Sequence, residues 1–234
     1  MKMKYIIWDF DGTILPSSPY DSEQTLLLYK LNKSSENIPF LKKVVARTII
    51  YADRKEWLGG SFKKYYLWVL QGTPIEILDR VAEFLVNKIT KADRQFFLRL
   101  KEDGYNMMIL SCGTVDLIER IIKLADLNDY FTIIPGNRFQ FTNNCISGMD
   151  FHITTPQDKL KVLNELDISS KHSIVVGDGY TDLPILDTAG IPIMIDRAGE
   201  KREKYVKKNY CFISSVTELG DVLPESCMKI DENR

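Results

Sequence analysis

The sequence predicts an α/β fold: a doubly wound parallel sheet with a Rossmann-like core, and a small helical cap inserted after the first strand. Short apolar runs rich in β-forming residues alternate along the chain with helical patterns, which is the order of elements in βαβ units. These runs are continuous, as expected for strands buried on both faces of a parallel sheet. One long segment near the N-terminus has helical patterns without such a run, which indicates an insertion.

Four apolar runs define the predicted sheet. The first covers residues 5–8 and ends at Asp9, followed by the turn residues Gly12 and Thr13. Amphipathic patterns that precede or follow the later runs predict the connecting helices. We expect the later strands at residues 106–110, 173–176 and 191–195, and helices at residues 91–101, 115–125, 159–166 and 182–187.

Residues 16–89 are predicted to form the helical cap domain, and residues 1–15 together with residues 90–234 the core domain. Proline and glycine residues mark the start of the cap segment and divide it internally, as they do between helices. Residues 137–152 predict a β-hairpin on the core, with two asparagines at its turn. The stretches of helical periodicity in the cap are residues 41–50, 62–70 and 75–89.

Length and charge narrow the class of protein. The 234 residues correspond to about one and a half typical domains. Lys and Arg total 31 against 32 Asp and Glu, so net charge gives no argument for a nucleic-acid or membrane partner. No stretch approaches the ~20 apolar residues that cross a bilayer, and Asp9 interrupts the first run too early for a signal peptide. We therefore expect a cytoplasmic protein. Its scattered cysteines are expected to be free thiols: Cys112, Cys145, Cys211 and Cys227.

Paired aspartates follow two of the predicted strands. An Asp-x-Asp-Gly-Thr motif carries Asp9 and Asp11, and a Gly-Asp-Gly-x-x-Asp motif carries Asp178 and Asp182. Each pair also fits a polar turn with a helix cap. Ligand sites of open parallel sheets lie at the carboxyl ends of strands, where four carboxylates would repel strongly without a cation. Their all-oxygen chemistry favours Mg²⁺.

A candidate anion site follows the second strand. Ser111, Cys112 and Gly113 precede a predicted helix, where a hydroxyl and free N–H groups suit phosphate or simply cap the helix. Lys159 opens another predicted helix, where an ammonium group is mildly unfavourable with the helix dipole; a surface position is the alternative. Cys112 is not expected to be a thiol nucleophile, because no motif connects it to either histidine.

The order of these motifs resembles the haloacid dehalogenase-like hydrolase superfamily, and within it the phosphoserine-phosphatase-like branch. The resemblance covers the sheet domain, residues 1–15 and about 91 onwards. The Ser-Cys-Gly sequence at residues 111–113, the Asn137-Arg138 pair and the Gly-Asp-Gly-x-x-Asp motif all fit this branch. A helical cap after the first motif fits it as well.

The resemblance implies a Mg²⁺-dependent phosphatase that hydrolyses a small-molecule phosphate monoester through an aspartyl-phosphate intermediate. Asp9 would be the nucleophile, and Asp11 the general acid and base. Asp182 would be either a metal ligand or a neighbour of the ligands. The implied phosphate site comprises Ser111, Cys112, Gly113 and Lys159, with Lys161 a less favoured substitute, and the implied metal site comprises Asp9, Asp11, Asp178 and Asp182.

Serine-specific members of this branch have a glutamate at the cap entrance that binds the amino group. The nearest acids here are Asp21 and Glu23, and their register differs, so serine phosphate is not assigned as the substrate. The expected partner is a small-molecule phosphate ester, with no nucleic acid and no membrane. We expect a monomer or homodimer.

Alternative functions remain open. A phosphomutase or phosphotransferase would share the intermediate and pass the phosphoryl group to another acceptor. A catalytically silent interaction module could use the same fold, because a fold alone does not establish a function. Its expected signature is loss of Asp9, Asp11 or Asp178, and all three are present. A signalling receiver would lack both the Asp-x-Asp-Gly-Thr opening and the long helical insertion.

Overall fold

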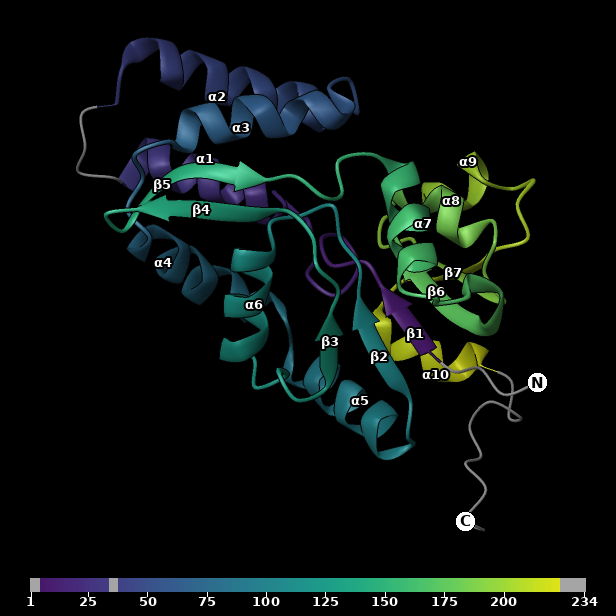
Figure 1. Ribbon diagram of the computed structural model, residues 1–234. Helices are drawn as coiled ribbons and strands as arrows, with labels where there is room; N and C mark the ends of the chain where they lie inside the picture. The colour runs from purple at the N-terminus through teal and green to yellow at the C-terminus, as the bar shows by residue number, and fades with distance from the viewer. Residues whose placement is uncertain (1–4, 34–37, 224–234) are drawn as a thin grey trace.

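The computed structural model describes residues 5–33 and 38–223, and within them it confirms the predicted fold class. Six parallel strands form one sheet in the order β3-β2-β1-β6-β7-β8, so the chain starts in the middle and extends the sheet to both sides (Figure 1). This is a doubly wound arrangement. The strands are β1 (Tyr5–Trp8), β2 (Asn106–Ile109), β3 (Phe131–Ile133), β6 (Ser173–Gly177), β7 (Ile191–Ile195) and β8 (Cys211–Ile213).

The sheet has two strands more than the four predicted. Strands β1, β2, β6 and β7 lie where the apolar runs place them, whereas β3 and β8 were not predicted. Both are three-residue edge strands that are only partly buried. Thr132 interrupts the apolar run of β3, and β8 comprises only three residues, which is why the pattern misses them.

Helices cover both faces of the sheet. They are α5 (Lys91–Glu102), α6 (Val115–Leu124), α7 (Pro156–Glu165), α8 (Leu183–Leu186), α9 (Lys201–Lys204) and α10 (Leu219–Val222), with short 3-10 helices η3 (Ser170–His172), η4 (Tyr180–Asp182) and η5 (Val216–Glu218). Successive β1 side chains point to opposite faces. Trp8 packs edge-to-face on Phe97 of α5 at a 5.3 Å centroid distance, whereas Ile7 is buried with Leu163 of α7 and Leu186 of α8.

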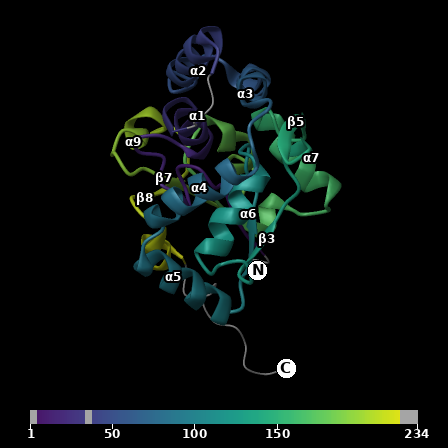
Figure 2. The same cartoon turned by 90° about the vertical axis from the view of Figure 1, so that its left-hand side faces the viewer.

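The described chain between β1 and β2 is helical. Its elements are α1 (Ser22–Lys33), α2 (Phe40–Asp53), η1 (Gly59–Ser61), α3 (Phe62–Leu70), α4 (Glu76–Leu85) and η2 (Val86–Lys88). Helix α3 has its predicted bounds, α2 is longer than predicted, and the stretch predicted at 75–89 is divided between α4 and η2. Figures 1 and 2 show α1, α2 and α3 beyond the carboxyl ends of the strands.

Helix α1 was not predicted, and its environment explains the omission. It is buried on nearly all sides, with Leu26 and Leu27 fully inaccessible and the polar residues Ser22, Glu23 and Gln24 buried as well. A helix without an exposed polar face has no amphipathic period for a sequence pattern to detect. Burial here therefore removed the signal that identified the other helices.

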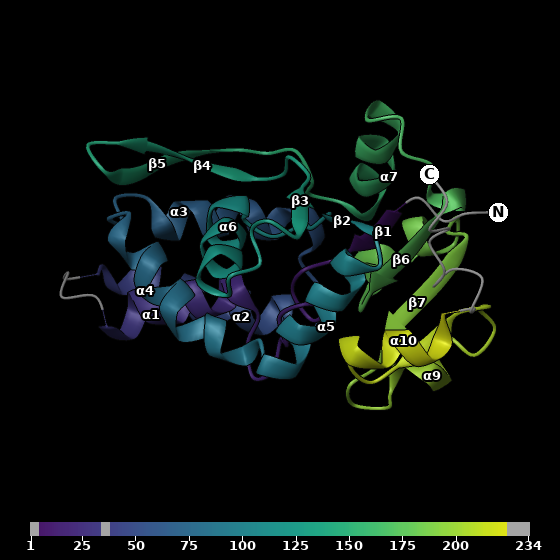
Figure 3. The same cartoon turned by 90° about the horizontal axis from the view of Figure 1, so that it is seen from below.

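The predicted hairpin forms between β4 (Arg138–Thr142) and β5 (Cys145–Asp150), and both turn residues, Asn143 and Asn144, have positive φ. It packs against the helical insertion, as Figure 3 shows. The N–H of Gly72 donates to Ile146 across 2.8 Å, and the N–H of Ile146 donates to Thr73 across 2.9 Å. The hairpin thus joins core and insertion.

Strand register brings the candidate site residues to one edge of the sheet. Trp8, the last residue of β1, is paired with Ile109 of β2 and with Val176 of β6. The three central strands therefore end at the same level, and the loops that follow them start side by side. This edge faces the helical insertion (Figure 1).

Some predictions fall at the limits of the described chain. Cys112, Cys145 and Cys211 are free thiols as predicted, whereas Cys227 lies outside the described residues. The predicted core and cap domains also include residues 1–4, 34–37 and 224–234, which lie outside the described residues, and the division into these domains stays a prediction.

Among the described helices, none combines the length and apolar character that a membrane span requires.

Candidate active site

The loops after β1, β2 and β6 line a common cavity. The N–H of Asp9 donates to the carbonyl of Val176, and that of Leu110 donates to the carbonyl of Trp8, both across 2.8 Å. These bonds extend the parallel ladder one residue beyond the strands and fix where the loops begin. The cavity has a volume of about 170 Å³, and these loops contribute Asp9, Asp11, Ser111, Cys112, Gly113 and Asp178 to its lining.

Gly12 allows the loop after β1 to approach Asp178. Its φ of 82° is a left-handed conformation that is strained for residues with a side chain. A Cβ atom on Gly12 would also lie 2.2 Å from Oδ2 of Asp178. Both requirements exclude a larger residue at position 12, because its side chain would push the carboxyl group of Asp178 away from that of Asp9.

Lys159 lies beneath the cavity and is 0% exposed. Helix α7 positions it through an N-terminal capping box formed by Thr155 and Asp158. Its ammonium group donates to Oδ1 of Asp9 across 2.8 Å and to Oδ1 of Asp182 across 2.6 Å. Burial lowers the pKa of Lys159, but the two carboxylates outweigh this effect and hold that pKa well above its ordinary value.

Lys161, the less favoured substitute, does not reach the cavity. Its side chain is exposed and lies 3.7 Å from Glu165 one helical turn further on. Two residues along α7 separate a wholly buried lysine side chain from a largely exposed one, as helix geometry allows.

Asp182 holds the loop after β6 together. Its Oδ2 accepts hydrogen bonds from the N–H of Asp178 (2.9 Å) and of Gly179 (3.1 Å), and its Oδ1 accepts the bond from Lys159. The side chain is fully buried and is absent from the cavity lining. Both oxygens of Asp182 are thus already engaged by protein donors.

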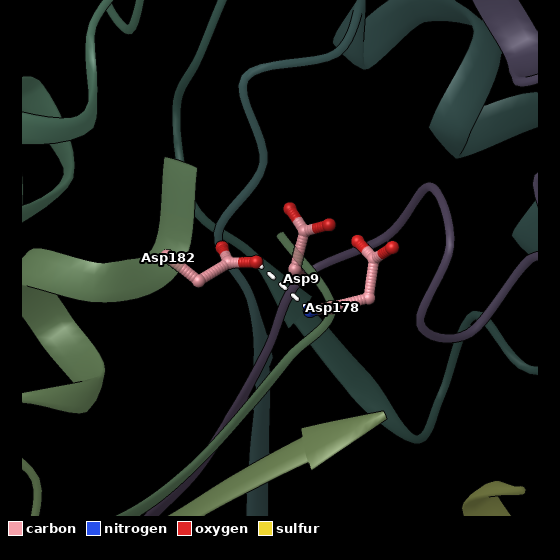
Figure 4. Close-up of side chains that lie close together, drawn as sticks. All are labelled: Asp9, Asp178 and Asp182. Atoms are coloured by element: carbon pink, nitrogen blue, oxygen red, sulfur yellow. Dashed lines mark hydrogen bonds between the residues drawn. The ribbon is translucent and has the colours of Figure 1, made fainter. Parts of the chain in front are cut away.

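Three carboxyl groups gather where β1 and β6 end. Asp9, Asp178 and Asp182 each offer an oxygen within 4.8 Å of the others, and in Figure 4 the carboxyl group of Asp9 lies between the other two. Burial raises the pKa of Asp9 to about 8; Lys159 opposes this rise, and the charges of Asp182 and Asp178 add to it. Without a further cation the cluster therefore cannot remain fully ionised at neutral pH.

Asp11 faces the same cavity and is held by the first residue of α1. Its Oδ1 accepts the N–H of Ser22 and its Oδ2 accepts the Ser22 hydroxyl, both across 2.7 Å. Burial raises the pKa of Asp11 to about 6, whereas the bonds from Ser22 favour the ionised form and limit that rise. A carboxyl group that titrates near neutrality is suited to both donate and accept a proton.

The loop at residues 111–113 is fixed by Asn137, which is fully buried. The amide of Asn137 donates to the carbonyl of Cys112 across 2.8 Å and to the carbonyl of Ile153 across 2.7 Å. Within the loop, the N–H of Gly113 donates to the hydroxyl of Ser111 across 3.0 Å. This arrangement presents a hydroxyl and backbone N–H groups to the cavity at the start of α6, which is suited to an anion.

Cys112 is unsuited to nucleophilic attack. Burial raises the pKa of its thiol to about 11, and the charge of Lys159 does not reverse this rise. The reactive species of cysteine is the thiolate, which is scarce at neutral pH when the thiol pKa is this high. The structure therefore agrees with the sequence prediction that Cys112 is not a nucleophile.

Two residues that bind the site's carboxyl groups were not predicted, and neither were Asp53, Thr154 and Tyr180 of the cavity lining. Ser22 follows Asp21, whose carboxylate accepts the N–H of Gln24 across 2.7 Å; an acid three residues before a glutamine is a helix-start signal that was available in the sequence. Lys201 of α9 donates to Oδ2 of Asp178 across 2.9 Å. It lies in a stretch with many basic residues, where nothing distinguishes it locally.

Fold and family together define an enzyme of the hydrolase class, as the sequence predicted. The chain belongs to the haloacid dehalogenase-like hydrolase family, whose model matches residues 3–190.

The chain is also similar to individual proteins, among them phosphoserine phosphatases. The protein named pyrophosphatase PpaX of Caldanaerobacter subterraneus is 24% identical over 198 residues, which are 82% of this chain and 80% of the relative. A phosphoserine phosphatase of Lactococcus lactis is 28% identical over 130 residues, 53% of this chain and 57% of the relative. The structure of a substrate-bound phosphoserine phosphatase superimposes with a TM-score of 0.71 at 18% identity, covering 96% of this chain and all of the other.

Proposed function

We propose that this protein is a Mg²⁺-dependent phosphatase that hydrolyses a small-molecule phosphate monoester through an aspartyl-phosphate intermediate. The observation that carries the proposal is the arrangement of two carboxyl groups at one cavity. Asp9 is held from below by the ammonium group of Lys159, and Asp11 is held from the side by Ser22. In this proposal Asp9 is positioned as the nucleophile, and Asp11 has a pKa suited to proton transfer.

The reaction proceeds in two displacements at phosphorus. A carboxylate oxygen of Asp9 attacks the phosphorus atom, the bond from phosphorus to the ester oxygen breaks, and the departing alcohol oxygen takes a proton from Asp11. A water molecule then attacks the phosphorus of the aspartyl phosphate while Asp11 accepts one of its protons. Inorganic phosphate leaves, and Asp9 is again a free carboxylate.

The loop at residues 111–113 binds the phosphoryl oxygens in this proposal. The hydroxyl of Ser111 and the N–H groups of Cys112 and Gly113 supply hydrogen bonds at the start of α6. Lys159 offsets the negative charge that Asp9 and the phosphate bring together. Its complete burial supports this role, because a buried ammonium group interacts with neighbouring charges through little intervening water.

The residues present fit a magnesium ion. The carboxylates of Asp9 and Asp178 and the backbone carbonyl of Asp11 would hold it, an all-oxygen set of the kind that Mg²⁺ prefers. We assign Asp182 to holding Lys159 and the loop after β6, because both of its oxygens already accept hydrogen bonds. When bound, the ion neutralises the clustered charge and orients the phosphoryl group.

Metal removal tests this proposal directly. EDTA should abolish release of inorganic phosphate from small phosphate monoesters, and added Mg²⁺ should restore it without any other acceptor. Asp178→Asn should raise the Mg²⁺ concentration for half-maximal activity by about tenfold or more, whereas Asp103→Asn, an exposed residue after α5, should leave it unchanged. Full activity in EDTA would contradict the proposal, and a requirement for an organic acceptor would favour a phosphotransferase.

Ser22→Ala should move the pH profile of catalysis. The substitution removes one of the hydrogen bonds that favour ionised Asp11, so the pKa of Asp11 should rise from about 6. The loss of about 1 kcal/mol corresponds to roughly half a unit to one unit. Because Asp11 must be protonated to act first as an acid, the alkaline limb of kcat/KM should shift to higher pH by that amount.

The matched control for Ser22 is Thr48→Ala, which removes an exposed hydroxyl of α2 that bonds only the carbonyl of Val44 among the described residues. Its kcat/KM profile should superimpose on that of the wild type. A Ser22→Ala profile with an unmoved or lowered alkaline limb would argue against Asp11 as the acid.

We also propose that residues 16–89 act as a cap over a core formed by residues 1–15 and 90–234. The lining of the cavity supports this division. Besides the loops of the core, it includes Asp21, Glu23, Asp53, Phe62 and Lys63, all from the helical segment. In this arrangement the core supplies the phosphoryl chemistry, and the cap surrounds the alcohol part of the substrate.

A further inference from the structure

Helix α2 is apolar on two opposite faces. Its inner face, with Ala46, Ile49 and Ile50, is buried where α2 packs against α1 and α3. Its outer face is exposed and nevertheless carries large apolar and aromatic side chains, those of Phe40, Leu41, Val44 and Tyr51. A helix at the surface of a globular protein usually has polar side chains on its exposed face, and a helix that is apolar all round is usually covered. The outer face of α2 therefore has the composition of a surface that binds another body.

Aromatic side chains extend this surface beyond α2. Trp57 is 70% exposed, and its ring packs edge-to-face on that of Tyr51 at a centroid distance of 5.9 Å. Helix α3 exposes Trp68 and, one turn earlier, Tyr65. The ammonium group of Lys42 of α2 lies 5.6 Å from the ring of Trp68, which places this ring beside α2. These three aromatic residues, together with the exposed apolar and aromatic residues of α2, form what we call the outer patch.

The outer patch lies in a basic part of the chain. The stretch from the start of α2 to the end of α3 contains seven Lys and Arg residues and two acidic residues, although the whole chain has a net charge of −1. Arg47 of α2 and Arg54, directly after it, are exposed on the outer side. Neither acid offsets them, because Asp53 lines the cavity and Glu56 lies 3.7 Å from Lys204 of α9. The patch is therefore both apolar and positively charged.

The position of the outer patch makes it accessible to a flat body. Figures 1 and 2 show α2 as the outermost element beyond the carboxyl ends of the strands, at the top of both views. A planar surface can contact a folded protein only at such an extremity. The same two helices line the cavity with other residues, Asp53 of α2 and Phe62 and Lys63 of α3. A body bound at the outer patch therefore does not occupy the cavity.

Charge and composition together select the occupant. A second copy bound about a twofold axis would bring like charges together, since Arg47 near the middle of α2 would lie opposite its own counterpart. A nucleic acid would pair its phosphates with the basic residues but would offer no apolar partner to Leu41 and Val44. An anionic lipid bilayer offers both, because its headgroups carry negative charge and its acyl chains are apolar. Tryptophan and tyrosine are also the residues enriched at the boundary between these two layers.

We propose that the outer patch docks this protein on the surface of a lipid bilayer that contains anionic lipids. Its apolar side chains enter the boundary between headgroups and acyl chains, and Arg47 and Arg54 pair with the headgroups. This mode of binding needs no membrane-spanning helix. The expectation of no membrane partner rested on the charge of the whole chain, which does not describe this local surface. The proposal does not depend on the proposed phosphatase function.

Sedimentation with lipid vesicles tests the proposal on the wild-type protein. We expect it to bind vesicles of phosphatidylcholine mixed with phosphatidylserine with a partition coefficient about tenfold or more above that for phosphatidylcholine alone. Added salt should weaken the binding, because it screens the charges. Equal partition into both kinds of vesicle would overturn the proposal. Absence of binding to either kind would overturn it as well, in favour of a protein partner.

Two substitutions then locate the contact with the bilayer. Leu41→Glu and Arg47→Glu should each lower the partition coefficient on the anionic vesicles by about tenfold or more. The matched control is Leu98→Glu, at an exposed leucine of α5, which Figure 1 shows at the opposite end of the molecule. It should change the partition coefficient by less than about twofold, because charges this far from the surface are screened.

Circular dichroism shows whether each variant is folded, so that loss of binding is not confused with loss of structure. An equal loss of binding in the Leu98 variant would overturn the proposal. So would unchanged binding in both α2 variants.

Discussion

Asp9→Asn should abolish phosphate ester hydrolysis, with kcat reduced by about 10⁴-fold or more. The amide has nearly the shape of the carboxylate but is not a nucleophile, so no aspartyl phosphate can form. The measurement is release of inorganic phosphate from the best ester at saturating Mg²⁺. Activity within about tenfold of the wild type would contradict the assignment of Asp9 as the nucleophile.

The same variant should remain folded, which separates loss of chemistry from loss of structure. Lys159 keeps its 2.6 Å bond to Asp182 when Asp9 loses its charge, so the ammonium group stays paired. The substitution also removes the repulsion between Asp9 and Asp178 that contributes to the raised pKa of Asp9. The midpoint of chemical denaturation should therefore stay close to that of the wild type.

Lys159→Met should have the largest effect on stability. The methionine fills most of the same volume but leaves Asp9 and Asp182 without their common cation in a site where Lys159 and Asp182 are both 0% exposed. Removal of one partner from a buried ion pair typically lowers the free energy of unfolding by about 3–5 kcal/mol. Chemical denaturation followed by circular dichroism measures the change.

Lys161→Met is the matched control, because it lies on the same helix with its side chain 73% exposed. Its free energy of unfolding should change by no more than about 0.5 kcal/mol. Adding Asp182→Asn to Lys159→Met should recover part of the lost stability, since it removes one of the unpaired charges. Equal stability of the Lys159 and Lys161 variants would show that the buried pairs contribute nothing measurable.

The sequence pattern was sufficient for the four strands buried on both faces and for the longer helices with one exposed face, but not for the four-residue helices α9 and α10. Strands β1, β2, β6 and β7 are continuous apolar runs, and the helices with one exposed face have a visible period. Edge strands β3 and β8 have only three residues each, and the all-round buried helix α1 has no exposed polar face. Each omission follows from the length or the environment of the element.

The candidate site likewise contains residues that the sequence predicts and contacts that it does not. Asp9, Asp11, Ser111 and Asp178 were predicted because strand ends and glycine turns are local features, and the structure brings them to one cavity. Their chemical roles remain predictions. Contacts between distant segments carry no local signal: the pair of Lys63 with Glu23 spans 40 residues, and neither side chain is distinguishable from a solvated one in the sequence.

The β4–β5 hairpin limits how the helical insertion can move. A body attached to another through two chain connections can rotate about the line through them, and an additional attachment away from that line removes this freedom. The bonds of Gly72 and Thr73 to Ile146, and of Ile75 to Asn144, provide such an attachment. An opening of the cavity that keeps these bonds would carry the hairpin along, and its hinges would then include the two ends of the hairpin as well as those of the insertion.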